Sequence, residues 1–304
     1  MLLNANQSFR NFAWFTLGYN VLVILWGALV RATGSGAGCG ANWPSCQGEL
    51  IPAGSSLETW IEFAHRATSG VALLLVVGLV VWAVRAFSKG HPARRAAAWS
   101  LVFIVIEALI GAGLVLFELV AQNSSTARAV IIALHLGNTF LLLGALALTA
   151  WWTSRPGCAS FADRAATTAA LALGAGCLML VGMSGAVTAL GDTLFPMGEL
   201  AVLGEAVQGH FLVQLRAWHP LLAVFLGAVV AAVAWRMGRD RPAARALGRA
   251  VAGLYAGQLA IGLANVTLAA PLWLQLVHLA AADAIWVAYV LLGAAALGGS
   301  VEAG

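Results

Sequence analysis

Apolar runs of about 20 residues, each long enough to cross a bilayer as a helix, recur along the whole chain. The pattern predicts about eight spans, near residues 12–30, 66–86, 98–120, 129–152, 165–190, 216–236, 246–268 and 272–298. The first run is too long for a secretory signal and lacks a clear small-residue cleavage site. We therefore expect an all-α polytopic membrane protein.

Composition excludes an ordinary soluble domain. Of the 304 residues, 61% are hydrophobic and 9% are charged, whereas soluble domains carry about 25% charged residues. Twelve of the sixteen basic residues fall on one side of the predicted membrane. They are Arg10, Arg85, Lys89, Arg94, Arg95, Arg155, Arg164, Arg236, Arg239, Arg241, Arg245 and Arg249, against Arg31, Arg66, Arg128 and Arg216 on the other side. The positive-inside rule then places both termini in the cytoplasm, here of a bacterial inner membrane. This loop asymmetry accounts for the net charge of +4 and gives no case for nucleic-acid binding.

Four histidines, His65, His135, His219 and His278, lie just inside the outer ends of spans two, four, six and eight. His65 and His219 start their spans, and His135 and His278 lie roughly 9 Å further in, at 1.5 Å of rise per residue. An imidazole in a hydrocarbon layer is costly without a partner, so such residues indicate a functional site. Haem iron, which takes axial imidazoles from facing helices, is the partner that fits best. The alternative is that each histidine is a polar residue at an interhelical contact.

Short sequence matches suggest that the chain contains two copies of a four-helix unit. Gly27-Ala28-Leu29-Val30 resembles Gly185-Ala186-Val187-Thr188, and Ile110-Gly111 resembles Ile261-Gly262. Glu107 and Gln258 occupy the same place relative to the second motif, and His65 and His135 correspond to His219 and His278. Two parallel four-helix bundles, residues 1–157 and 158–304, would each own one histidine pair and one bis-histidine haem site. Chance similarity among Ala/Leu/Gly-rich helices is the competing explanation.

Two cysteines, Cys39 and Cys46, lie in the first outer loop, where Gly and Pro allow a tight turn. The outer side of a bacterial membrane is oxidising, so a short-loop disulfide is plausible. Two cysteines with no nearby histidine do not make a zinc site. Both a structural and a redox role stay open for the pair.

The segment from Arg31 to Pro52, with its Gly-Cys…Trp-Pro-Ser-Cys loop, followed by Glu62-Phe63-Ala64-His65-Arg66, resembles the haem A synthase family. The resemblance covers nearly the whole chain. It implies oxidation of the C8 methyl of haem O to a formyl group, which makes haem A for terminal oxidases. Haem O synthase and an electron acceptor are the further partners that such an activity implies.

The resemblance also implies roles for individual residues. His65 and His135 would hold the substrate haem O, and His219 and His278 would bind a haem b cofactor with its iron. Glu62 lies one helical turn before His65, where it could accept protons or stabilise charge, or could be an ordinary helix-end acid. Arg31 and Arg66 suit haem propionates, or snorkel to the interface. The chain departs from its own repeat at Pro220, which follows His219 where Arg66 follows His65.

Two other classes of function compete with the enzyme. A di-haem b-type cytochrome exchanging electrons with quinone fits the histidine pairs equally well, but gives no reason for Glu62, Arg66 or the loop cysteines. A proton-coupled transporter would use polar groups at mid-membrane, where Glu107 and Asp283 are the candidates. The histidines instead gather near one face.

Overall fold

The computed structural model describes residues 2–53, 56–154, 164–196 and 208–298. Eight long helices in these ranges are apolar enough to cross a membrane, which confirms the polytopic all-α class. They are α1 (Leu2–Ala32), α2 (Leu57–Ala86), α3 (Pro92–Leu116), α4 (Thr126–Trp152), α5 (Ala165–Leu194), α9 (Trp218–Asp240), α10 (Arg245–Thr267) and α11 (Leu272–Leu297). Three short helices, η1 (Ser35–Ala37), α8 (Phe211–Leu215) and η3 (Pro242–Ala244), lie in the connections.

Polar residues just outside the apolar runs set where several helices begin. The hydroxyl of Ser56 accepts the backbone N–H of Thr59 at the start of α2, and that of Ser125 accepts the N–H of Arg128 at the start of α4. These are N-caps, which satisfy backbone donors that a first helical turn leaves free. The cap makes α2 begin nine residues before the predicted start at residue 66.

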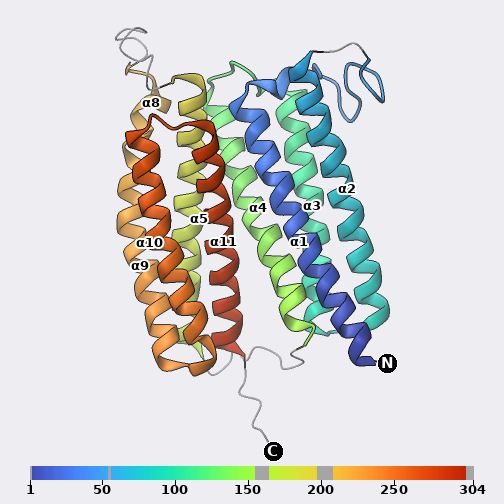
Figure 1. The fold of residues 1–304 in the computed structure, drawn as a ribbon, viewed down its shortest axis with the longest axis vertical. Helices are drawn as coiled ribbons and strands as arrows, with labels where there is room; N and C mark the ends of the chain where they lie inside the picture. Colours follow the sequence, from blue (N-terminus) through green and yellow to red (C-terminus); the bar gives the residue numbers. More distant parts are fainter. Residues whose placement is uncertain (1, 54–55, 155–163, 197–207, 299–304) are drawn as a thin grey trace, which may run out of the picture.

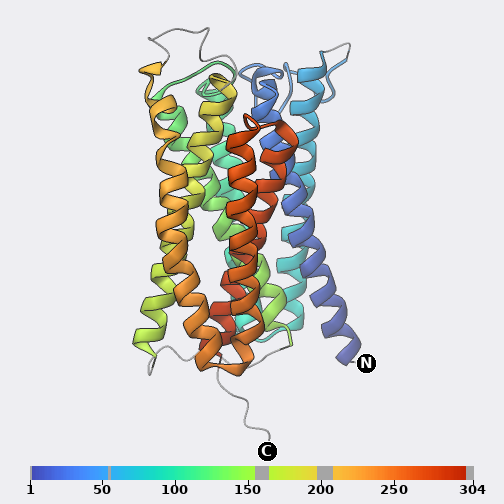
Figure 2. The ribbon, with the colours of Figure 1, turned by 60° about the vertical axis from the view of Figure 1, so that its left-hand side comes forward.

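The helices form two rings of four. Helices α1, α2, α3 and α4 contact one another in cyclic order, and so do α5, α9, α10 and α11. Helices α1 and α4 of the first bundle meet α5 and α11 of the second, so the two bundles stand side by side (Figures 1 and 2). The expected boundary between residues 157 and 158 lies outside the described residues.

Aromatic side chains pack in the interface between the two bundles, here called the seam. They enter notches, which are places where a glycine leaves space on the facing helix. Phe140 of α4 stacks on Trp286 of α11, with ring centroids 5.2 Å apart. A Cβ on Gly144 would lie 3.3 Å from the Trp286 ring nitrogen, and one on Gly182 would lie 2.5 Å from the Phe140 ring. Small residues let membrane helices approach closely enough for dispersion forces to hold them together.

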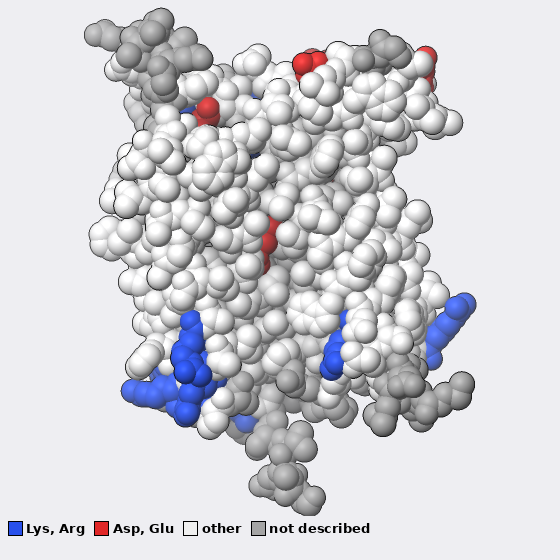
Figure 3. Space-filling model, viewed as in Figure 1, with Lys and Arg blue, Asp and Glu red and all other residues white. Residues whose placement is uncertain are grey.

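Charges on the visible face gather at the two ends of the molecule (Figure 3). Lys and Arg side chains cluster at the end where α1 begins and α11 finishes, and an uncharged belt covers most of the length between the ends. A few acidic atoms show in the middle of this belt. The arrangement fits a membrane-embedded body with its cationic loops on one side.

Candidate functional site

All four histidines lie at similar depths from the end of the molecule opposite the cationic loops. His65 is the ninth residue of α2, His135 the tenth of α4 and His278 the seventh of α11. His219 is the second residue of α9, but α8 precedes it, and it is the ninth residue counted from Phe211. The prediction that His65 starts its span was therefore wrong, because the capped first turns of α2 lie outside the apolar run. The correction brings the four imidazoles closer to one level.

In the first bundle, His65 and His135 belong to helices that are not consecutive in the ring, and they lie within electrostatic range of each other. The imidazole of His65 rests against Gly27 of α1. A Cβ on Gly27 would lie 3.0 Å from Cε1 and 3.2 Å from Nε2 of His65. The glycine therefore leaves room for the ring nitrogen. Nδ1 of His65 is buried and has no hydrogen-bond partner among the described residues.

His135 faces a polar cluster on α3 and α4. Its Nδ1 lies 3.2 Å from Oε1 of Glu107. The hydroxyl of Thr139 donates to the same oxygen at 2.5 Å, and the amide of Asn138 donates to Oε2 at 2.5 Å. The carboxylate is thus held in place by two donors, and its position beside Nδ1 leaves Nε2 as the ring nitrogen available to a metal.

The second bundle repeats the glycine arrangement. A Cβ on Gly185 of α5 would lie 3.0 Å from Cε1 of His219, and one on Gly262 of α10 would lie 3.2 Å from Cε1 of His278. The two imidazoles face each other edge to face, with ring centroids 6.4 Å apart. Ser184 pairs with Nδ1 of His219 at 2.9 Å, whereas Nδ1 of His278 has no partner in the described part of the chain.

These donor sets fit haem better than a bare metal ion. Within the described ranges, no group of three or more His, Cys, Asp or Glu side chains could hold an ion. Haem supplies four of the iron ligands itself and needs only one or two axial side chains. Each bundle offers two imidazoles on non-consecutive helices, with glycine beside three of the four rings. Buried polar nitrogens without partners are costly, so a bound group that engages these rings would stabilise the bundle.

The loop between α1 and α2 is closed by a disulfide and is held against α2 by a hydrogen bond to Glu62 and a close contact at Gly38. Cys39 and Cys46 form a disulfide, and both are buried. Glu62, 3% exposed, accepts the backbone N–H of Cys39 at 2.8 Å through Oε2 and a guanidinium N–H of Arg66 at 2.5 Å through Oε1. A Cβ on Gly38 would lie 2.6 Å from the backbone nitrogen of Thr59, so only glycine fits there.

Arg66 makes further contacts with the same loop. Its Nη1 donates to the carbonyl oxygens of Asn42 at 2.6 Å and Ser45 at 2.7 Å. With its ion pair to Glu62, this places the whole guanidinium between α2 and the disulfide loop. Glu62 and Arg66 therefore lie together beneath the loop, within one turn of His65 on α2.

Arg31 joins the two bundles. From the end of α1 its guanidinium donates to the carbonyl of Ala189 and the hydroxyl of Thr193 on α5, and to Oε1 of Gln275 on α11 at 3.1 Å. Gln275 lies one turn before His278. The end of the second site that lies opposite the cationic loops is thus held by a cation from the first half of the chain.

Sequence reasoning missed several polar groups near these sites. Arg216, one turn before His219, pairs with Asp192 of α5 at 2.9 Å. Arg128, 4% exposed, donates to the carbonyls of Ala121 and Asn123. Asp283, which the sequence did single out as a polar group at mid-membrane, is 1% exposed, and neither carboxyl oxygen has a hydrogen-bond partner among the described residues. Ser184 could have been found, because it directly precedes the repeated Gly185.

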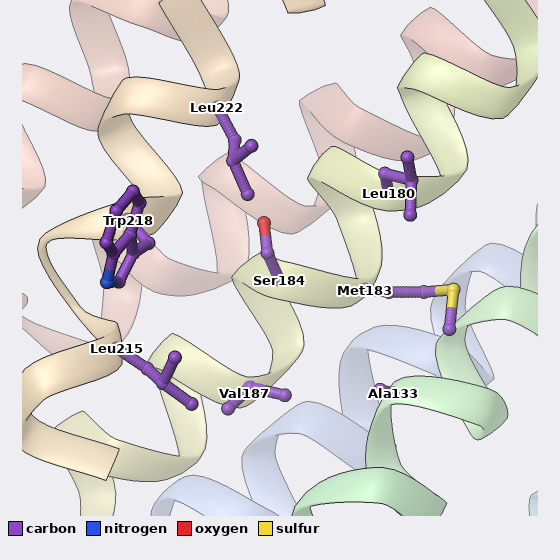
Figure 4. A pocket seen from close by; sticks show the side chains of 8 residues that line it. All are labelled: Ala133, Leu180, Met183, Ser184, Val187, Leu215, Trp218 and Leu222. Carbon is purple, nitrogen blue, oxygen red and sulfur yellow. The ribbon is translucent and has the colours of Figure 1, made fainter. Parts of the chain in front are cut away.

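A cavity of about 340 Å³ lies beside the second site, between α4, α5, α8 and α9 (Figure 4). Its lining is almost wholly apolar: Ala133, Leu180, Met183, Ser184, Val187, Leu215, Trp218 and Leu222. Ser184 and Leu222 point toward each other across it (Figure 4). Because Ser184 also contacts His219, the cavity adjoins the imidazole pair from the side of the seam.

Comparison with known proteins adds a family match. The model of the COX15-CtaA family, described as cytochrome oxidase assembly protein, matches residues 10–290. A protein of Thermus thermophilus named protoheme IX farnesyltransferase is 53% identical over 291 residues, which are 94% of this chain and 48% of the relative.

Two relatives named heme A synthase match shorter stretches. The one from Exiguobacterium sibiricum is 38% identical over 138 residues, 45% of this chain and 43% of the relative. The one from Alkalihalophilus pseudofirmus is 39% identical over 128 residues, 42% of this chain and 40% of the relative. The chain spans about half the length of the curated relatives it matches.

Proposed function

Because the chain belongs to the COX15-CtaA family of cytochrome oxidase assembly proteins, we propose that it is a haem A synthase, an oxidoreductase that converts the C8 methyl of haem O to a formyl group. The observation that carries this proposal is the presence of one histidine pair in each bundle, with all four imidazoles at similar depths along their helices. The names of relatives matched over about half of their length support it.

In this proposal the two bundles have different tasks. His65 and His135 hold the substrate haem O in the first bundle, beside Glu62 and the disulfide loop. His219 and His278 hold a resident haem b in the second bundle. A haem b held by these two histidines would supply one-electron transfer. The repeat supports the division, because only the first copy has the Glu62–Arg66 pair.

The chain's own residues orient the substrate. The histidines fix the plane and height of the ring, and Gly27 leaves space beside Nε2 of His65. The disulfide loop, fastened by Glu62 and Arg66, covers the outer end of α2. We propose that Glu62 also takes up charge or protons released as the methyl is oxidised, because it lies one turn from His65. In the same proposal Arg31 and Arg66 pair with the propionates, for which each guanidinium would exchange bonds that it now makes to protein acceptors.

The partners follow from the same chemistry. The Thermus relatives carry the name of a protoheme farnesyltransferase, and farnesyl transfer to protohaem yields the farnesylated haem that this reaction consumes. We propose that such an enzyme supplies the substrate, that water supplies the formyl oxygen, and that an electron acceptor takes the four electrons released together with four protons. The cationic end of the molecule then faces the cytoplasm of a bacterial inner membrane, with both termini there.

The test is conversion of haem O by the full chain in membranes of a host that makes haem O and lacks a haem A synthase of its own. Haems are extracted and separated, and the wild-type chain is expected to yield haem A. His65→Ala and His135→Ala should abolish it at equal protein abundance. Haem b at both sites with no haem A would contradict the enzyme and favour the electron-transfer cytochrome.

The test of Glu62 distinguishes two properties of its side chain, its negative charge and its hydrogen bond to the loop. Glu62→Gln keeps the shape and the bond from Cys39 but cannot ionise, and we expect haem A to fall by about 100-fold, the usual scale for a general base. Arg66→Met is the matched control, because it frees the loop and keeps the carboxylate. Equal losses in both variants, with the substrate haem still bound in Arg66→Met, would make Glu62 a loop-positioning residue only.

A further inference from the structure

The two bundles differ at one position that faces a histidine. Glu107 on α3 and Gln258 on α10 occupy equivalent places before the Ile-Gly motifs of the two copies. Each lies beside the histidine of the following helix, His135 or His278. The first bundle therefore has a carboxyl group where the second has a neutral amide.

Glu107 is held so that its carboxylate faces the imidazole. Asn138 and Thr139 donate to its two oxygens, and Nδ1 of His135 lies 3.2 Å from Oε1. Turning the ring N–H onto this oxygen completes a hydrogen bond from imidazole to carboxylate. No other acceptor competes for the Nδ1–H, because Nδ1 has no other partner among the described residues.

Gln258 makes a different contact. Its Nε2 donates to the backbone carbonyl of His278 at 3.0 Å rather than to the ring. Oε1 of Gln258 and Nδ1 of His278 both lack partners in the described ranges. Whichever way the amide is turned, a neutral acceptor binds an N–H more weakly than a carboxylate does.

We propose that Glu107 is a positioning residue that makes His135 the more basic axial ligand, and that Gln258 leaves His278 without this effect. The inference rests on the proposed function, since it concerns iron held by these imidazoles. A carboxylate that accepts the Nδ1–H of a metal-bound histidine fixes the ring and strengthens its donation through Nε2. Stronger donation stabilises oxidised iron, so the first site has the lower reduction potential for a given haem. The asymmetry gives the substrate site and the electron-transfer site different electronic properties from one repeated scaffold.

Asp283 is the other acid near this cluster. It lies on α11, which contacts α4 across the seam, and it is within electrostatic range of Glu107. A carboxyl there acts only through space, because neither of its oxygens bonds to a described residue. Asp283→Asn is therefore the control that separates a general field effect from the contact with Nδ1.

The experiment is a spectroelectrochemical titration of the purified, haem-loaded full chain, with each haem assigned by its loss in His65→Ala or His278→Ala. Glu107→Gln is expected to raise the reduction potential of the first-bundle haem and leave the second unchanged. Gln258→Glu is expected to lower that of the second-bundle haem. Asp283→Asn should shift the first-bundle potential less than Glu107→Gln, and Glu107→Asp should restore it in part.

Two results would overturn the inference: unchanged potentials in both Glu107→Gln and Gln258→Glu, or an equal shift in Asp283→Asn. If Glu107→Gln fails to retain haem, Gln258→Glu in the intact second site decides alone. Measuring the reduction potentials requires bound haem but does not require conversion of haem O to haem A. A chain that shows the shifts but makes no haem A would therefore contradict the proposed function and leave this inference standing.

Discussion

At the scale of single residues, the sites depend on glycines as much as on histidines. Three of the four imidazoles lie where a Cβ on Gly27, Gly185 or Gly262 would approach within 3.2 Å. The fourth glycine of the repeat, Gly111, has no atom within 4 Å of such a Cβ, because His135 points to Glu107 instead. The repeated glycines were visible in the sequence, but their contact with the rings was not, since it depends on the rotation of each helix.

Gly185→Ala should weaken haem retention in the second bundle by about tenfold or more, because overpacking a fitted site costs about 1–3 kcal/mol. Gly27→Ala should do the same in the first bundle. Absorption spectra of the purified variants, with haem per protein, measure the effect. Gly111→Ala is the matched control and should keep wild-type occupancy. Equal haem occupancy in all three variants would show that the space these glycines leave beside the imidazoles is not needed for haem binding.

At the scale of elements, the sequence predicted each long helix but placed some ends poorly. Helix α2 begins at Leu57 rather than near residue 66, because its first turns hold Glu58, Glu62 and His65 and break the apolar run. The Ser56 hydroxyl caps this first turn by accepting the backbone N–H of Thr59, and the disulfide loop donates the backbone N–H of Cys39 to Glu62. Hydropathy alone cannot reveal that a loop will fold back and pair with a helix.

Arg66→Met should loosen the outer loop without unfolding the bundle. The variant removes two bonds to loop carbonyls and the ion pair to Glu62, and hydrogen bonds to a charged group contribute about 1.5–3 kcal/mol each at most. We expect backbone amides of residues 39–47 to exchange hydrogen about tenfold faster or more. Exchange in α9 and α11 should stay unchanged. If the loop amides of the variant were protected from hydrogen exchange as well as those of the wild type, Arg66 would not hold the loop against α2.

At the scale of the whole molecule, two parallel four-helix units were predictable from the repeat, while their docking was not. The seam depends on shape, as Trp286 and Phe140 enter notches at Gly144 and Gly182. Arg31 adds a polar fastening, since it reaches from α1 to α5 and α11. The sequence suggested only a propionate contact or snorkelling for Arg31, because acceptors 158 or more residues away cannot be read from the chain order.

Arg31→Met should lower the free energy of unfolding by about 2 kcal/mol, the scale for hydrogen bonds to a charged group. The loss should appear as a lower thermal midpoint of the purified protein in detergent, monitored by helical circular dichroism. Arg85→Met, on an exposed position at the cationic end, should leave the midpoint within error. Identical midpoints for the wild type and Arg31→Met would mean that the seam does not depend on this side chain.

The central claim is that each bundle holds its own haem through its own two histidines, and extraction of haems from single-histidine variants tests it most directly. His219→Ala and His278→Ala should each remove haem b and keep the farnesylated haem in the first bundle. His65→Ala and His135→Ala should remove the farnesylated haem and keep haem b. Variants from one bundle that lose both haems while the protein stays folded, or that lose neither, would contradict two separate sites.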